Sequence, residues 1–159
     1  MFDRLNTLLQ QEKARFRVIH HAAEGSSAKV AEIRGTLPSQ GAKAMLCRVK
    51  GVAELPDVFV LAVLSGDRKI DFKKVGAAVG GKKASLASPQ EATTLTGCVM
   101  GAVPPFSFWP NIRLVADPKL IEDHEEIAFN AGRLDTSIVL NSSDYQRIAA
   151  PLRAEISAE

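Results

Sequence analysis

The stretch VFVLAVL, residues 58–64, is the longest apolar run in the chain and is rich in β-branched residues. A short run of this kind, followed by the turn signal Gly66-Asp67, predicts a strand that is buried on both faces of a sheet. The run is far shorter than the roughly 20 residues that cross a bilayer. We therefore expect the fold to be organised around this central strand, with no association with a membrane.

The segment AKAMLCRVK, residues 42–50, predicts a second strand with two different faces. Lys43, Met45, Cys47 and Val49 share one face, and the apolar members of that set should point inward. A lysine among them either extends to the solvent at the end of the strand or lies at the mouth of a pocket. In a pocket, the ammonium group could hold a phosphate or a developing negative charge.

The other segments predict short helices and strands in irregular alternation. Ser88-Pro89-Gln90-Glu91 has the pattern of a helix N-terminus, and this helix should end before Gly97. Ser26 or Ser27 should begin another helix, with Val30 and Ile33 inward. The remaining strands are expected at 16–20, 112–116, 127–130 and 137–140, and the remaining helices are expected after caps at Asp3, Asp71 and Ser143.

This order of elements lacks the regular period of a doubly wound sheet. With 159 residues, we predict a single α/β domain over residues 1–159, with a mixed, curved, barrel-like sheet flanked by short helices. Twenty Lys and Arg against 18 Asp and Glu leave a net charge of only +2, so any contact with nucleic acid should be local. Two cysteines and an N-terminus without a secretory signal predict a cytoplasmic protein.

The common catalytic and metal-binding motifs are missing. There is no G-x-S-x-G, P-loop, H-E-x-x-H or C-x-x-C pattern. His20 and His21 would point to opposite faces of a strand and could not share one metal ion, so we expect neither a metal nor a cofactor. Cys47 and Cys98 are expected to be structural thiols rather than nucleophiles.

The segment Gly97–Pro105 predicts a stiff loop with accessible amides. Its glycines let the backbone approach a ligand closely, and its two prolines restrict the exit of the loop. Such a loop can direct an N–H group at a carbonyl oxygen, although an ordinary tight connection has the same composition. Phe106, Phe108 and Trp109 could stack on a base or anchor the loop to the core.

Three motifs in this order resemble the YbaK/EbsC family. They are AKAML around Lys43, TGCVMGAVPPF at 96–106, and IAFNAG at 127–132, which is followed by SIVL. The resemblance runs from about residue 21 to residue 148, and the stretch ASLASPQEATTLTG is similar to the YeaK-like branch. This family contains free-standing editing proteins related to the insertion domain of bacterial prolyl-tRNA synthetase.

The resemblance implies a barrel-like mixed sheet and hydrolysis of the ester between a wrong amino acid and the terminal adenosine of tRNA. It assigns Lys43 to holding the CCA end of the tRNA. It assigns the amide of Gly101, at the start of the G-x-x-x-P element that ends at Pro105, to the ester carbonyl. A side-chain nucleophile is not required, since water can be activated with help from a ribose hydroxyl of the substrate.

The resemblance also predicts which residues bind the substrate around these two catalytic residues. Asn130 stands where several relatives carry serine, so the pocket for the amino acid is expected to differ here. Asp135 and Ser137 are further polar candidates for the substrate pocket, and Ser137 is the stronger one because it lies on a predicted strand. The predicted substrate-binding residues are Gly97, Pro104, Pro105, Asn130, Gly132 and Ser137.

We therefore predict a trans-editing aminoacyl-tRNA deacylase for a small mischarged amino acid of the alanine, serine, threonine or cysteine class. Apolar pockets separate molecules that differ by one methylene by only about 1–3 kcal/mol, so synthetases for small side chains need a second selection. The alternatives are a non-catalytic module that binds the CCA end or a synthetase, and a hydrolase of an unrelated small ester. The sequence leaves a synthetase partner and the oligomeric state open, and it is compatible with a monomer.

Overall fold

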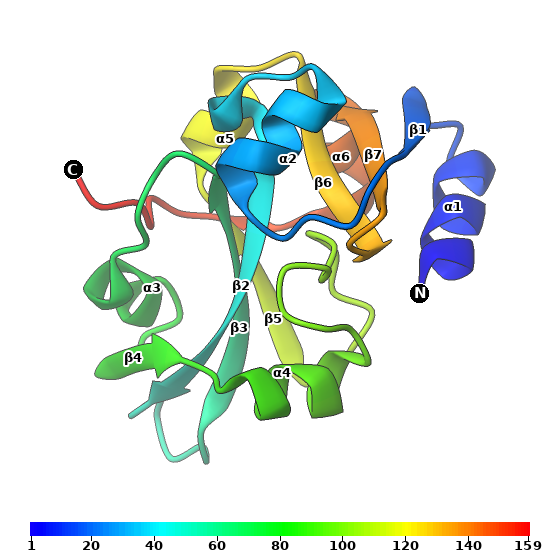
Figure 1. The fold of residues 1–159 in the computed structure, drawn as a ribbon. Helices are drawn as coiled ribbons and strands as arrows, with labels where there is room; N and C mark the ends of the chain where they lie inside the picture. The colour runs from blue at the N-terminus through cyan, green and yellow to red at the C-terminus, as the bar shows by residue number, and fades with distance from the viewer.

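The computed structural model describes residues 1–159 as two β-sheets with short helices around them (Figure 1). The smaller sheet is antiparallel and has the order β1-β7-β6. β7 pairs with β1 on one side and with β6 on the other, so a strand near the N-terminus lies beside two strands near the C-terminus. These strands are β1 (Phe16–His20), β6 (Glu126–Arg133) and β7 (Thr136–Asn141).

The larger sheet is mixed and has the order β4-β2-β3-β5-β8. β2 runs antiparallel to both β4 and β3, whereas β5 runs parallel to β3 and to β8. Its strands are β2 (Ala42–Lys50), β3 (Val58–Ser65), β4 (Lys83–Leu86), β5 (Ile112–Ala116) and β8 (Leu152–Arg153).

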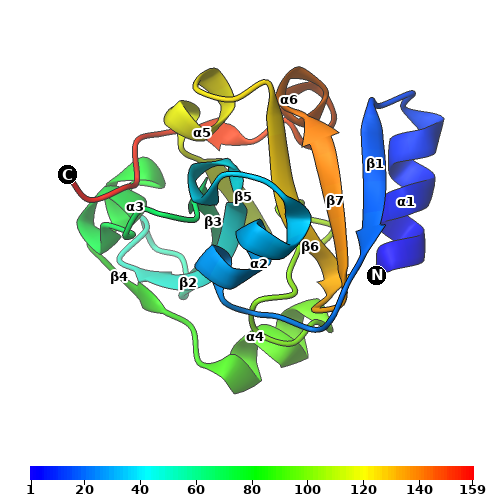
Figure 2. The same cartoon turned by 45° about the horizontal axis from the view of Figure 1, so that its top comes forward.

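A bridge between Gly41 and Ala128 links the two sheets, just before β2 begins and within β6. In Figure 2, β6 and β7 stand at an angle beside β2 and β3. The predicted mixed and curved α/β architecture is confirmed, with the curvature located at this junction between a three-stranded and a five-stranded sheet. The angle between the sheets leaves room for a cavity at the junction.

The helices begin largely where their capping residues predict. Asp71 accepts from the amides of Lys73 and Lys74, and Ser88 and Glu91 form the predicted capping box. The closing helix is capped by Asn141 rather than by the predicted Ser143, and Asp3 lies inside the first turn of the first helix rather than at its cap. None of the helices has the length and apolar character needed to span a membrane. The helices are α1 (Phe2–Gln11), α2 (Ser27–Arg34), α3 (Phe72–Ala78), α4 (Pro89–Thr96), α5 (Pro118–Glu122) and α6 (Ser142–Ala149), with a 3-10 turn at Pro38–Gln40.

The central strand β3 is buried on both faces, as its composition predicts. Val63 packs into one cluster of hydrophobic residues, with α1, α6 and the smaller sheet. Its neighbours in the chain, Ala62 and Leu64, pack into a second cluster with α3 and the C-terminal segment. Leu61 belongs to a third cluster, with α4 and the loop that follows it. The cavity described below lies on the side of the first and third clusters.

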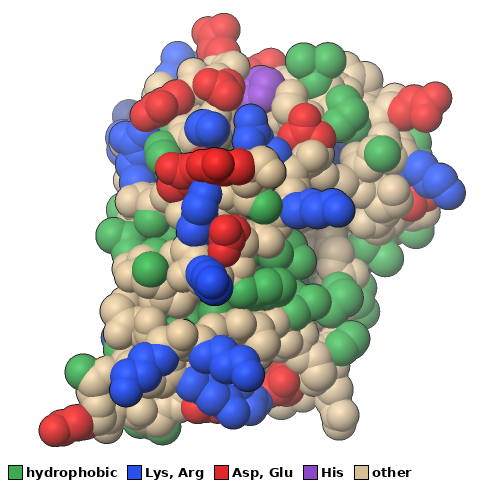
Figure 3. Space-filling view, turned by 90° about the vertical axis from the view of Figure 1, so that its left-hand side faces the viewer, with side chains coloured by type: hydrophobic (Ala, Val, Ile, Leu, Met, Phe, Trp, Pro, Cys, Tyr) green, Lys and Arg blue, Asp and Glu red, His purple; other side chains and the backbone are tan.

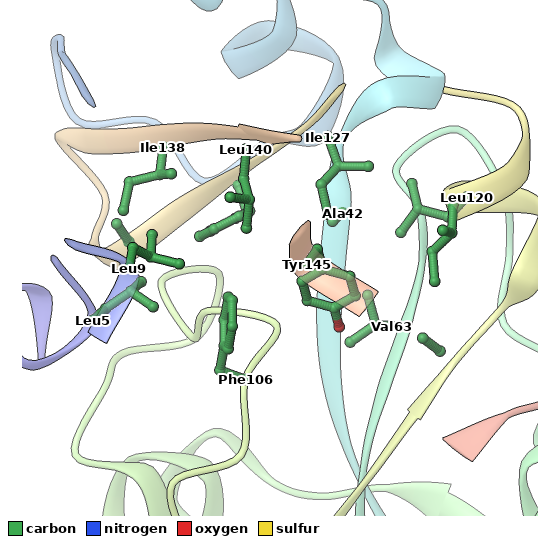
Figure 4. Packing of buried hydrophobic residues seen from close by; sticks show 14 residues of the cluster. Leu5, Leu9, Ala42, Val63, Phe106, Leu120, Ile127, Ile138, Leu140 and Tyr145 are labelled. Carbon is green, nitrogen blue, oxygen red and sulfur yellow. The ribbon is translucent and has the colours of Figure 1, made fainter. Parts of the chain in front are cut away.

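Phe106 anchors the loop before β5 to the first cluster. Its ring meets the ring of Tyr145 edge-on at 5.3 Å between centroids (Figure 4). The hydroxyl of Tyr145 donates to the carbonyl oxygen of Pro105 at 2.7 Å, and burial raises the pKa of this hydroxyl. Of the two roles expected for Phe106, stacking on a base or anchoring the loop, the structure supports anchoring. The bond from Tyr145 also holds Pro105 in place.

Candidate active site

One cavity lies at the junction of the two sheets and is lined by residues of α2, α4, the start of β2 and the loop 97–105. Figure 2 shows how these elements are arranged. Its volume is about 230 Å³. Hydrophobic residues make up 12 of the 19 that line it, so a few polar groups determine what it can bind. Three predicted site residues are among the lining residues: Lys43, Gly101 and Asn130.

Lys43 is half-buried and extends from β2 to the carbonyl oxygen of Arg68, to which its ammonium donates. Burial lowers the pKa of Lys43, and the nearby carboxylate of Asp67 opposes this shift. An ammonium has three donors, so one bond to a carbonyl leaves donors for an oxygen of a ligand. Lys43 is thus one of the lining residues, and its side chain is partly held by the backbone.

The loop after α4 contributes backbone amides to the cavity. Met100, Gly101 and Val103 line it, and their N–H groups have no hydrogen-bond partner within the protein. Gly101 has a φ of +89°, which a residue with a Cβ adopts only with strain. The carbonyl oxygen of Gly101 accepts from the side-chain amide of Asn130 at 3.0 Å, so this turn of the loop is fixed from β6.

Asn130 has no free hydrogen-bonding group for a ligand. Its Nδ2 donates to the carbonyl oxygens of Gly101 and Glu24, and its Oδ1 accepts from Arg34 and Ser137. An asparagine side chain offers two donors and two acceptor sites, and all four are used. Asn130 therefore connects the loop to α2 and β7 rather than presenting a free polar group.

Arg34, at the end of α2, is a polar lining residue that the sequence did not single out. It is only 8% exposed, and it donates from Nε to Ser137 Oγ at 2.7 Å and from Nη2 to Asn130 Oδ1 at 3.0 Å. Burial lowers the pKa of Arg34 to about 10, so it stays charged at neutral pH. The expected inward residue Ile33 is instead 45% exposed, because the face of α2 that turns inward carries Val30, Ala31 and Arg34.

Five of the predicted substrate-binding residues do not line the cavity. Gly97 ends α4 in the left-handed conformation, and Gly132 donates its amide to Ala102 at 2.8 Å within a bulge of β6. Pro104 and Pro105 are buried in the exit of the loop. Ser137 is fully buried and contacts Arg34 and Asn130. These residues position the loop and the polar side chains that do line the cavity.

The two cysteines are unsuited to attack a substrate. Both are buried, and burial raises the pKa of Cys47 to about 12 and that of Cys98 above its usual value. Thiols with raised pKa values stay protonated at neutral pH and are poor nucleophiles. His21 also lies outside the cavity, and its Nε2 contacts Ser137 Oγ at 2.7 Å.

The entrance to the cavity is apolar and lies near basic groups. Leu86 and Met100 line the cavity and are 43% and 47% exposed. On the face shown in Figure 3, hydrophobic side chains gather in a band, with Lys and Arg side chains below it and a mixture of basic and acidic side chains above it. Farther along β2, Lys50 pairs with Lys83 of β4. Exposed apolar side chains together with the lining residue Lys43 suit a ligand that has a flat apolar part and phosphates.

Comparison with known proteins identifies relatives of the whole arrangement. The family described as the aminoacyl-tRNA editing domain matches residues 21–148. The chain is 54% identical, over 149 residues, to the multifunctional Ser/Thr-tRNA deacylase ProXp-y of Escherichia coli. That alignment covers 94% of this chain and 88% of the relative.

Solved structures show the same fold at lower sequence identity. A crystal structure of a hypothetical protein has a TM-score of 0.84 at 20% identity and covers 98% of this chain and 99% of its own. A crystal structure of a proposed trans-editing enzyme for prolyl tRNA synthetase has a TM-score of 0.81 at 20% identity, with 99% and 97% covered. At this identity the likeness concerns the fold alone.

Proposed function

The chain belongs to the family of aminoacyl-tRNA editing domains, and we propose that it is a trans-editing deacylase that removes serine and threonine from mischarged tRNA. The 54% identical relative carries the name of a Ser/Thr-tRNA deacylase, which supports both the reaction and the choice of amino acids. The observation that carries the proposal is the joint presence of Lys43 and the unpartnered Gly101 amide in one small cavity. The proposed place of action is the cytoplasm.

The proposed reaction is hydrolysis of the aminoacyl ester by water. The water oxygen bonds to the carbonyl carbon, the bond from that carbon to the ribose oxygen breaks, and the ribose oxygen leaves with a proton. The amide of Gly101 donates to the carbonyl oxygen as negative charge develops there. Lys43 holds a phosphate or ribose oxygen of the terminal adenosine, and Leu86 and Met100 pack against its base.

The size and charge of the cavity support this assignment. A volume of about 230 Å³ is enough for a small aminoacyl group. The cavity is lined by the cations Lys43 and Arg34 and by no carboxylate. This positive charge favours binding of the electron-rich oxygens of the ester and of the phosphate. The predicted synthetase partner remains a proposal, which assays with and without a synthetase would test.

The experiment is a deacylation assay on tRNAs charged with serine, threonine, alanine, cysteine and a large amino acid such as leucine. We expect release of serine and threonine well above the spontaneous rate and no release of leucine. Binding of tRNA without ester loss would instead establish the non-catalytic module. Hydrolysis of free esters, but not of aminoacyl-tRNA, would establish an unrelated esterase.

The Lys43→Ala variant tests the assigned site. We expect kcat/KM for seryl-tRNA to fall by about 100-fold, because a positioned cation next to the reacting group is lost. Lys119→Ala, at an exposed lysine of α5, is the matched control and should keep wild-type activity. Undiminished activity of Lys43→Ala would remove Lys43 from the mechanism.

A further inference from the structure

Two polar side chains that line the cavity, those of Ser27 and Arg34, have no part in the reaction described above, and only that of Arg34 is charged. Arg34 donates through Nε and Nη2 to Ser137 and Asn130, but its Nη1 has no partner in the protein. No carboxylate pairs with this guanidinium, since its only polar contacts are a hydroxyl and an amide oxygen. Arg34 lines the cavity, and its Nη1 lies beside Gly41, another lining residue, so this free donor is open to a bound molecule.

The two side chains that Arg34 contacts offer no free acceptor to a ligand. Asn130 has both acceptor sites occupied, and Ser137 is fully buried behind it. A guanidinium has five N–H donors and no acceptor. A ligand group that meets Nη1 must therefore supply an oxygen that accepts a hydrogen bond.

Only one part of a small aminoacyl ester fits these requirements. The α-ammonium group is a cation and a donor, so the charge of Arg34 repels it. The ester carbonyl is assigned to the Gly101 amide, and the adenosine to Lys43. The remaining acceptor is an oxygen on the side chain of the amino acid itself, which serine and threonine have and alanine and valine lack.

We propose that Arg34 determines the amino-acid specificity of the site by donating from Nη1 to the side-chain hydroxyl of the seryl or threonyl group. The proposal rests on the deacylase function above. Apolar lining residues such as Val30 and Ala128 then surround the carbon atoms of the same side chain. Ser137 and Asn130 act as positioning residues, because they hold the guanidinium plane in place.

The wild-type protein already provides one test. Threonine and valine have nearly the same shape and differ by a hydroxyl in place of a methyl group. We expect kcat/KM for threonyl-tRNA to exceed that for valyl-tRNA by about 10- to 100-fold, the contribution of one hydrogen bond to a charged group. Equal rates for the two esters would overturn the proposal. Faster release of aspartate than of serine would also overturn it, because the site would then select negative charge.

The second test replaces Arg34. In Arg34→Met, kcat/KM for seryl- and threonyl-tRNA should fall by about 10- to 100-fold, whereas that for alanyl-tRNA should change by less than about threefold. The matched control is Arg147→Met, an exposed arginine of α6, which should leave all three rates unchanged. An equal fall for all three substrates in a folded Arg34→Met variant would show a merely structural role.

The two proposals fail in different ways. If the wild type releases none of the amino acids, the deacylase function is wrong. If it releases serine and threonine but the preference over alanine survives in Arg34→Met, only the role of Arg34 is wrong. Should Arg34→Met not fold, equal wild-type rates for threonyl- and valyl-tRNA would still overturn the proposal.

Discussion

Gly101 combines a left-handed backbone conformation with an amide that the protein leaves free. A Cβ at this position would meet Leu134 at 3.5 Å and Gly25 at 3.7 Å, which is ordinary contact. A side chain would therefore fit at this position, and it is the φ of +89° that requires glycine. The direction of the N–H bond depends on that angle, so backbone geometry is part of the chemistry at this residue.

Replacing Gly101 with alanine separates these effects. We expect a stability loss of about 1 kcal/mol from the strained φ, together with a fall in kcat/KM of about tenfold or more as the amide shifts. Gly80→Ala is the matched control, since Gly80 has a φ of +73°, open space around it and no place in the cavity. It should lose similar stability and keep its activity. A Gly101→Ala variant with full activity would exclude a role for the amide.

At the scale of elements, α4 and its cap support one wall of the cavity. Ala92 of α4 lines the cavity, and the loop that carries Gly101 continues from Gly97 at the end of this helix. The hydroxyl oxygen of Ser88 accepts from the backbone amide of Glu91 at 3.1 Å, and the carboxylate of Glu91 accepts from the backbone amide of Ser88. The capping box thus fixes the start of the element whose end positions the loop.

Ser88→Ala should lower the free energy of unfolding by about 1 kcal/mol, the usual cost of losing an N-cap side chain. Urea unfolding followed by circular dichroism would measure it. Ser85→Ala, at an exposed serine of the neighbouring strand β4 with no side-chain hydrogen bond, provides the comparison and should change stability little. Equal stability of the two variants would show that the cap contributes nothing in the folded protein.

The elements also show which features the sequence could reveal. Capping signals and alternation act over a few residues, so α4 and the two faces of β2 follow from local patterns. The burial of the Arg34 side chain could not be predicted in this way, because its partners Asn130 and Ser137 are about a hundred positions away in the chain. The short strand β4 is missed for a similar reason, since its pairing with β2 defines it. Alternation along 42–50 singles out Lys43 and composition singles out the loop of Gly101, whereas Asn130 and the joining of the three into one site come from the resemblance, which carries long-range information.

For the whole molecule, Asp117 fastens the C-terminal segment to the larger sheet. This buried carboxylate accepts from the amides of Ile156, Ser157 and Lys119 and from the hydroxyl of Ser157. Burial by itself would raise the pKa of Asp117, but these hydrogen bonds outweigh it and leave the pKa below its usual value. Ile156 fills the second cluster, so the tail is part of the core.

A lowered folded pKa means that the charged form of Asp117 stabilises the protein above the unfolded pKa of about 4, and that this contribution is lost as the pH falls through the folded value. Asp117→Asn should therefore cost about 2–3 kcal/mol at pH 7. The difference from the wild type should shrink as the pH is lowered below about 4. Denaturation curves from pH 7 to pH 2 would measure it, with the exposed Asp123→Asn as comparison. A difference that is constant over this range would contradict the assignment.

The seam between the two sheets has a consequence for how such a protein can diverge. The amino-acid end of the cavity is built by α2 and β6, whereas Ala87, Ala92 and Val103 at its other end pack in the cluster under α4. Because the two ends draw on different packing clusters, mutations at one need not disturb the other. If the proposed function holds, substitutions around Arg34 can change which amino acid is accepted without changing the part of the cavity under α4, and related genes can diverge in the mischarged amino acid that they remove.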